Sequence, residues 1–198
     1  MSSMRLVSIL LAFVFVCSAG AFADNMLANG SFDEEYLAPW VADPTLDIQV
    51  QTEWNGVKPM KEAGAQFLVV SGPAQVGCTY ARLITQSLSA PFGEDIPNDN
   101  FLVYLYAATY LHTTDDRAVS YALTIEPGYG AMVASFHGGA RNAWVTAESS
   151  GYYYSTDPYD LLAPAKPLTV VLELRDPLLA GEYLLLDSVG LYYGGGGY

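Results

Sequence analysis

The sequence predicts an all-β protein, a sandwich of two antiparallel sheets. Three observations indicate this class. Apolar and polar residues alternate in several short segments, turns rich in Gly, Pro, Asn and Asp separate them, and no helix-length amphipathic pattern follows the first 23 residues. Many short strands with little helix are typical of a sandwich, because each sheet buries one face against a second layer.

The N-terminal residues 1–23 have the features of a secretory signal peptide. Arg5 provides the positive charge, residues 7–16 are almost wholly apolar, and Ala-Phe-Ala at 21–23 is a small-x-small cleavage pattern. The apolar run is shorter than the about 20 residues that span a bilayer. We therefore expect an exported protein, extracellular, at the cell surface or periplasmic, with one domain over residues 24–193 and no transmembrane segment in the mature chain.

Charge and cysteine content narrow the classes of partner. Cleavage removes Arg5 and no acidic residue, so the net charge goes from −13 to −14. Such an acidic surface repels nucleic acid and anionic lipid. Cleavage also leaves Cys78 as the one mature cysteine, so we expect no intramolecular disulfide and interpret Cys78 as a small buried residue. A lipoprotein signal with lipid attachment at Cys17 is the alternative to cleavage after residue 23, although Val16 stands where a small residue is usual.

Period-two alternation predicts half-buried strands at 47–51, 119–126 and 168–175. Each should turn one face to the core and the other to water. The residues expected to face the core are Ile48, Val50, Val119, Tyr121, Leu123, Ile125, Leu168, Val170, Leu172 and Leu174.

Three other segments are apolar on both faces and predict central strands. They are 67–70, 101–110 and 183–193, the last interrupted by Asp187. The glycine run that follows, with Tyr198, predicts a flexible tail over 194–198.

Four segments resemble, in order, those of a known family. Residues 29–33 read Asn-Gly-Ser-Phe-Asp, 64–70 read Gly-Ala-Gln-Phe-Leu-Val-Val, 84–88 read Ile-Thr-Gln-Ser-Leu, and 184–191 read Leu-Leu-Leu-Asp-Ser-Val-Gly-Leu. They are similar to the motifs of galactose-binding-like jelly-roll domains, among them carbohydrate-binding modules of families 4, 9 and 22. The resemblance implies a jelly-roll sandwich whose opening strand lies beside the closing one.

The chain departs from this family in three places. Asp33 stands where Glu is usual, Ser188 replaces a second Asp, and residues 112–165 match no motif. The family's ligand loops would lie in that middle part.

The resemblance also implies a structural calcium between the opening and closing strands. Its ligands would be the Ser31 carbonyl and the carboxylates of Asp33 and Asp187, with Glu62 as a further oxygen donor. Calcium takes 6–8 oxygen ligands. A buried Asp187 must be paired, hydrogen-bonded or metal-bound, so backbone N–H groups at a strand end are the alternative partners.

Aromatic residues are the candidates for a ligand site, because Trp and Tyr rings stack on the C–H faces of sugars. We predict glycan binding by Trp54, Trp144, Tyr152 and Tyr154, with amides such as Gln49 and Gln51 available for hydroxyl groups. The alternative is that these aromatics only fill sheets and cores.

We therefore predict a non-catalytic carbohydrate-binding protein whose partner is a glycan. The alternative is an extracellular or cell-surface module that holds other proteins and binds no sugar. A small hydrolase is a third hypothesis. His137-Gly-Gly-Ala resembles the oxyanion loop of esterases, but the Gly-x-Ser-x-Gly elbow that such enzymes need is absent from the sequence.

Overall fold

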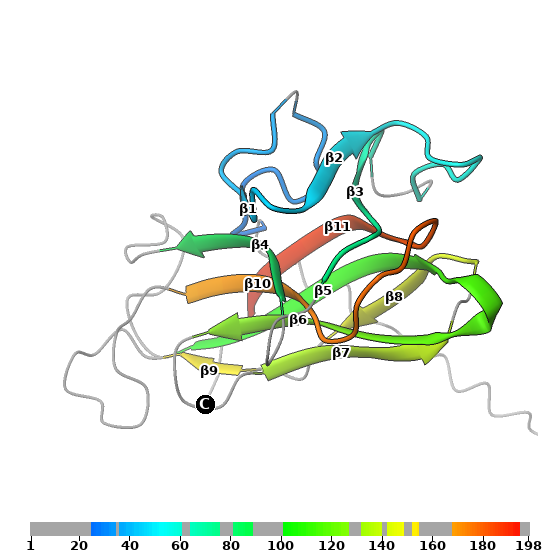
Figure 1. The fold of residues 1–198 in the computed structure, drawn as a ribbon. Coiled ribbons are helices and arrows are strands. Elements are labelled where there is room, and N and C mark those ends of the chain that lie inside the picture. The colour runs from blue at the N-terminus through cyan, green and yellow to red at the C-terminus, as the bar shows by residue number, and fades with distance from the viewer. Residues whose placement is uncertain are drawn as a thin grey trace, which may run out of the picture.

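The computed structural model describes residues 25–34, 36–60, 64–75, 81–88, 101–126, 132–139, 142–148, 152–154 and 168–194 (Figure 1). The predicted signal peptide, Glu62, Cys78 and residues 195–198 of the predicted tail lie outside these ranges. Within the described part of the chain, no helix has the length and apolar character needed to cross a membrane.

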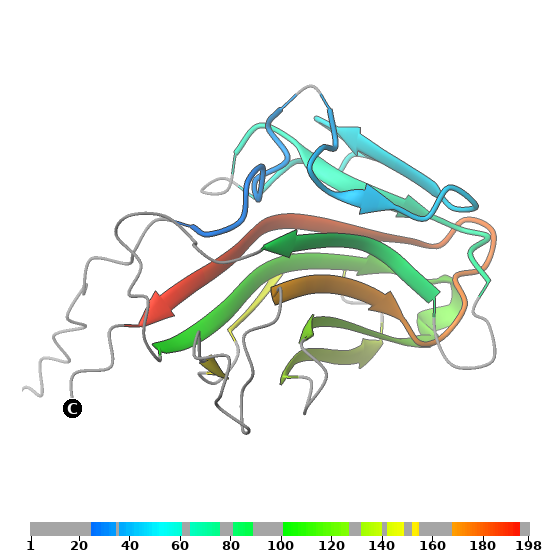
Figure 2. The same ribbon diagram turned by 90° about the vertical axis from the view of Figure 1, so that its left-hand side faces the viewer.

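Two antiparallel sheets form the molecule, as Figures 1 and 2 show. The five-stranded sheet has the order β1 (Val41–Ala42), β4 (Ala81–Leu88), β10 (Leu168–Leu174), β6 (Ala118–Glu126) and β7 (Met132–Gly139). The six-stranded sheet has the order β2 (Asp47–Gln51), β3 (Phe67–Ser71), β11 (Tyr183–Gly194), β5 (Phe101–His112) and β8 (Val145–Glu148), and β9 (Tyr152–Tyr154) also pairs with β5. A short 3-10 helix, Thr114–Asp116, follows β5. The predicted all-β sandwich is confirmed.

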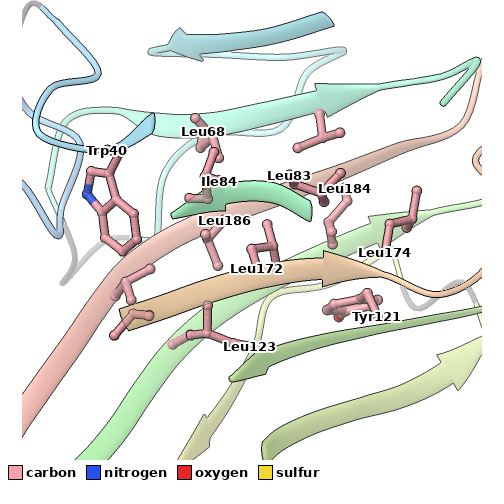
Figure 3. Close-up of a cluster of buried hydrophobic side chains, with 14 of the residues drawn as sticks. Trp40, Leu68, Leu83, Ile84, Tyr121, Leu123, Leu172, Leu174, Leu184 and Leu186 are labelled. Atoms are coloured by element: carbon pink, nitrogen blue, oxygen red, sulfur yellow. The ribbon is translucent and has the colours of Figure 1, made fainter. Parts of the chain in front are cut away.

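The main core lies between the sheets and is built from alternate residues of each strand. Figure 3 shows leucines of β3, β10 and β11 together with Trp40 in this core. Leu68, Leu172 and Leu186 are fully buried, and burying a side chain of this size contributes about 1.5–3 kcal/mol. All ten predicted core-facing residues are buried in this core or packed against it.

The prediction of a water-facing side is wrong for parts of β6 and β10. Ala122, Thr124, Val171 and Glu173 are also buried. The reason is the place of β10 inside its sheet, where neighbours flank it on both sides: Val171 lies opposite Thr85 and Thr124. By contrast, the predicted central strands β3, β11 and β5 are all interior strands of the six-stranded sheet.

The N-terminal segment lies beside the closing strand, as predicted, but residues 25–34 form turns and not a strand. Asn29 and Phe32 have φ angles of 49° and 56°, which break an extended conformation. Backbone hydrogen bonds still join the segment to β11: Met26 N donates to Leu191 O and Val189 N donates to Gly30 O, both at 2.8 Å.

Two residues of the predicted motifs explain this close docking. A Cβ atom on Gly30 would lie 2.2 Å from the carbonyl oxygen of Val189, so only glycine fits there. The Gln86 side chain joins the segment to the other sheet, because its Nε2 donates to Ala28 O at 2.9 Å and its Oε1 accepts from Ala28 N at 3.0 Å. The turn segment is thus tied to both sheets.

Candidate functional site

A second cluster of aromatic and apolar side chains covers the outer face of the six-stranded sheet. On β3 and β11, Leu68 and Leu184 face the main core, so their sequence neighbours face outward. We call this set the outer aromatic cluster. It consists of Trp54, Val57, Phe67, Val69, Tyr110, Trp144, Tyr183 and Leu185.

Trp54 reaches the cluster from a tight turn that follows β2. Asn55 and Gly56 have φ angles of 48° and 83°, as a two-residue hairpin turn requires. Backbone bonds of 2.9 and 2.8 Å between Trp54 and Val57 close the turn. The Trp54 ring packs edge-on against Tyr183, with ring centroids 6.4 Å apart. Its buried Nε1 has no hydrogen-bond partner among the described residues.

Trp144 reaches the same cluster from the chain before β8. Its Nε1 donates to Lys58 O at 2.9 Å. Its ring meets Phe67 and Tyr110 edge-on, with centroids 5.8 Å away in each case. Both tryptophans are half-buried. The structure therefore brings together two of the residues predicted to bind glycan.

The cluster continues onto β5 through residues that the sequence analysis did not select. The rings of Tyr110 and Tyr183 are nearly parallel, with centroids 6.2 Å apart, and His112 stacks on Tyr183 at 4.8 Å. His112 Nδ1 lies 2.9 Å from Asn142 Oδ1. Burial raises the pKa of Tyr183, and the neighbouring Tyr110 adds to the shift. The available signal for Tyr110 and His112 was their spacing of two positions, which places both on one face of a strand.

A row of polar side chains on β2 borders the cluster. Ile48 and Val50 pack toward the main core, so Asp47, Gln49 and Gln51 lie on the outer face. Gln51 Nε2 donates to Gln49 Oε1 at 3.0 Å, and Gln49 Nε2 donates to Asp47 Oδ1 at 2.8 Å. Hydrogen bonds from Ser71 and Gln49 lower the pKa of Asp47. Amide groups and an ionised carboxylate therefore lie one strand away from Phe67 and Val69 on β3.

The other two predicted ligand residues pair with a different part of β5. Tyr152 and Tyr154 lie on β9, opposite Val103 and Phe101 of β5. Val103 is seven positions from Tyr110, about 23 Å along a strand that rises about 3.3 Å per residue. The side chains of β9 lie outside the described part of the structure, so their role in a glycan site stays a prediction.

Of the predicted metal ligands, Asp187 lies on the outer face of β11, and Asp33 is close enough for its negative charge to act on Asp187. Asp187 is fully buried, and its Oδ2 accepts from Met60 N at 3.0 Å. The pKa of Asp187 is raised to about 6, mainly because the side chain is buried. Hydrogen bonds from the N–H groups of Met60 and Ser188 oppose this shift, and the negative charge of Asp33 adds to it. Among the described residues, Asp187 Oδ1 has no hydrogen-bond partner.

Asp33 is exposed, and its carboxylate lies against the start of β3. Its Oδ1 accepts from Ala65 N at 2.7 Å and from Gln66 N at 3.1 Å. A Cβ atom on Gly64 would lie 2.4 Å from Asp33 Oδ2. Ser31 is half-buried in the adjoining turn. No three His, Cys, Asp or Glu side chains gather in the part of the chain that the structure describes. Two nearby carboxylates, one with an unsatisfied buried oxygen, suit a hard cation that takes oxygen ligands.

Neither a family model nor a curated protein sequence matches the chain. Solved structures do. The CBM22-1 xylan-binding domain of Paenibacillus barcinonensis Xyn10C shares 18% identity over 87% of this chain and 96% of its own, with a TM-score of 0.57. TmCBM61, solved with β-1,4-galactotriose, shares 13% identity over 87% of this chain and 100% of its own, with a TM-score of 0.60.

A cyclase has the same fold. The Stig cyclase Fisc from Fischerella sp. TAU shares 15% identity over 85% of this chain and 96% of its own, with a TM-score of 0.53. The chain is thus a β-sandwich structurally similar to carbohydrate-binding modules of families 22 and 61, and the predicted resemblance to family 22 is confirmed for the fold. Because a cyclase shares the fold, the fold does not decide between binding and catalysis.

Proposed function

We propose that the protein is a secreted, non-catalytic carbohydrate-binding module of the jelly-roll type. The observation that carries the proposal is the outer aromatic cluster, which presents two half-buried tryptophans beside a row of amides on a sandwich like those of families 22 and 61. The features of a signal peptide at residues 1–23 support export.

In this proposal the glycan lies across the outer face of the six-stranded sheet. The exposed parts of the Trp54 and Trp144 rings would contact the C–H faces of sugar units. Gln49 and Gln51 each have a hydrogen-bonding amide that their mutual contacts do not saturate, and these would bond sugar hydroxyl groups. The net charge of −13 favours a neutral glycan over an anionic one.

One observation favours the second candidate, a module that holds other proteins without binding sugar. Phe67, Val69 and Leu185 are fully buried beneath the Trp54 turn and Trp144, so the tryptophans also serve to cover the sheet. If this is their whole role, the cluster is a second core and the exposed ring edges bind nothing.

Retention on immobilised polysaccharides separates the two candidates. We expect at least one neutral polysaccharide to retard the mature chain, and Trp54→Ala or Trp144→Ala to weaken that binding about fivefold or more, as the loss of an aromatic anchor does. Tyr36→Ala is the matched control, because Tyr36 is 70% exposed and lies outside the cluster. No retention on any polysaccharide would favour the protein-holding module. Turnover of ester or glycoside substrates would contradict the non-catalytic part of the proposal.

We also propose calcium as the cation that Asp33 and Asp187 hold, with the Ser31 carbonyl and Glu62 as further ligands. Asp187 Oδ1, which has no hydrogen-bond partner among the described residues, and the close approach of Gly64 to Asp33 Oδ2 support this assignment. Bound calcium would offset the charge of both carboxylates. The N–H groups of Met60, Ala65 and Gln66 hold the carboxylates of Asp187 and Asp33 in position.

A further inference from the structure

One short segment of chain touches both the outer aromatic cluster and the acidic pair. Val57, at its start, packs in the cluster and is bonded to Trp54. The next residue, Lys58, accepts the Trp144 indole N–H at 2.9 Å, and Met60 donates to Asp187 Oδ2 at 3.0 Å. Within four residues the backbone is therefore held by both tryptophans and by a buried carboxylate.

The closing strand makes a second connection. On β11, Tyr183, Leu185 and Asp187 share the outer face, opposite His112, Tyr110 and Ala108 of β5. Tyr183 and Leu185 form the floor of the cluster. Asp187 follows two positions after Leu185, about 7 Å along the strand. The Asp187 carboxylate thus lies next to the outer aromatic cluster.

The other carboxylate holds the start of β3. Asp33 Oδ1 accepts from the N–H groups of Ala65 and Gln66. The next residue is Phe67, whose ring meets Trp144 with centroids 5.8 Å apart. Both members of the acidic pair are thus hydrogen-bonded to backbone that leads, within three residues, to a contact of Trp144.

From these connections we propose that cation binding at Asp33 and Asp187 is coupled to the arrangement of Trp54 and Trp144. Without a cation, the fully buried Asp187 keeps one carboxylate oxygen that has no hydrogen-bond partner among the described residues. A cation would hold both carboxylates in place, and with them the hydrogen bonds to Met60, Ala65 and Gln66. The cation site is therefore a regulator of the aromatic surface and not a remote structural feature.

The consequence for a glycan rests on the proposed function. If the ordered arrangement of the tryptophans is the one that binds sugar, cation and glycan must strengthen each other's binding by the same factor. Coupling between two sites typically changes affinity by about 5–150-fold. The coupling to the tryptophans themselves needs no glycan and can be measured alone.

The test is a titration of the mature chain with Ca²⁺ alone, followed by tryptophan fluorescence, with binding measured in parallel by calorimetry. The chain has three tryptophans. We expect Ca²⁺ to bind and to change the emission. The change should persist in Trp40→Phe, because Trp40 lies in the main core, and should be lost or halved in Trp144→Phe. Asp187→Asn should abolish the change, whereas Asp115→Asn, at an exposed position, should leave it intact.

A second variant distinguishes a loss of Ca²⁺ binding from a folding defect in Asp187→Asn. Gly64→Ala keeps both carboxylates but displaces that of Asp33, and should weaken Ca²⁺ binding and the emission change together. Ca²⁺ binding without an emission change, an emission change confined to Trp40, or no Ca²⁺ binding would each overturn the proposal. Failure to retain any polysaccharide would instead count against the proposed function and would leave the Ca²⁺ response unaffected.

Discussion

Glu182 shows at the scale of one residue how a buried charge is kept stable in this sandwich. Its side chain is fully buried and pairs with Arg117. Thr114 N and Oγ1 donate to its Oε1 at 3.0 Å, and Leu179 N donates to its Oε2 at 2.7 Å. Burial by itself would raise the pKa of Glu182, but the hydrogen bonds from Arg117, Leu179 and Thr114 outweigh it and lower the pKa to about 2.

This residue predicts a defined dependence of stability on acid. Because the pKa of Glu182 in the folded state lies below the ordinary value of 4.5, the stabilisation is fully present above that pH and is lost as the pH falls from about 4.5 to about 2. A shift of this size corresponds to about 3 kcal/mol. We expect Glu182→Gln to lower the free energy of unfolding at pH 7 by about that amount, since Arg117 loses its partner.

Urea denaturation at several pH values measures the effect. The variant should lose less stability than the wild type between pH 5 and pH 2, while Glu34→Gln, at an exposed position, should follow the wild type. Parallel acid profiles for Glu182→Gln and the wild type would show that the Glu182 carboxylate is not held in its ionised form.

Among the elements, the hydrogen bonds between the N-terminal turns and β11 hold the two ends of the sandwich side by side. The segment bonds to β11 through Met26, Gly30 and the side chain of Asn25, and it also carries Asp33. If calcium binds here, Asp33→Ala and Asp187→Ala should each lower the melting temperature more in calcium than in chelator, because only the calcium-bound wild type gains binding energy.

Thermal unfolding in the two media checks this prediction, with Asp115→Asn as the control. Each acidic variant should lie several degrees below the wild type in calcium and much closer to it in chelator. Equal losses in both media would remove calcium from the account and leave the two carboxylates as hydrogen-bond acceptors for the N–H groups of Met60, Ala65 and Gln66.

The contact between the N-terminal turns and β11 shows what sequence patterns can and cannot predict. The motif at 29–33 predicted that the segment lies beside the closing strand, because Gly30 and Asp33 depend on close neighbours. It did not predict turns in place of a strand, because the left-handed conformations of Asn29 and Phe32 depend on tertiary contacts such as the Trp40 Nε1 bond to Asn29 O. Alternation in β10 likewise identified the core face, but not the burial of Val171 and Glu173 on the other face.

For the whole molecule, the sandwich fold was predictable because apolar and polar residues alternate along several of its strands. The residues of the candidate site were predictable only in part. Trp54 could be selected from its polar, turn-forming neighbours. The contributions of His112, Tyr110 and Tyr183 depend on how β5 and β11 pair across 71 positions of sequence. The position of Tyr152 and Tyr154 along β5 depends on the register of β9. Residue type identifies candidates, and long-range register decides which of them meet.

We propose that the outer face of the six-stranded sheet binds glycan through Trp54 and Trp144. NMR spectra of the three indole N–H groups test it most directly, with a glycan from the retention screen added stepwise to the mature chain in calcium. We predict that the signals of Trp54 and Trp144 shift with a common saturating curve, while that of Trp40, which is 4% exposed in the main core, stays in place. Saturable glycan binding that leaves the Trp54 and Trp144 signals unmoved would show that the glycan binds elsewhere on the protein.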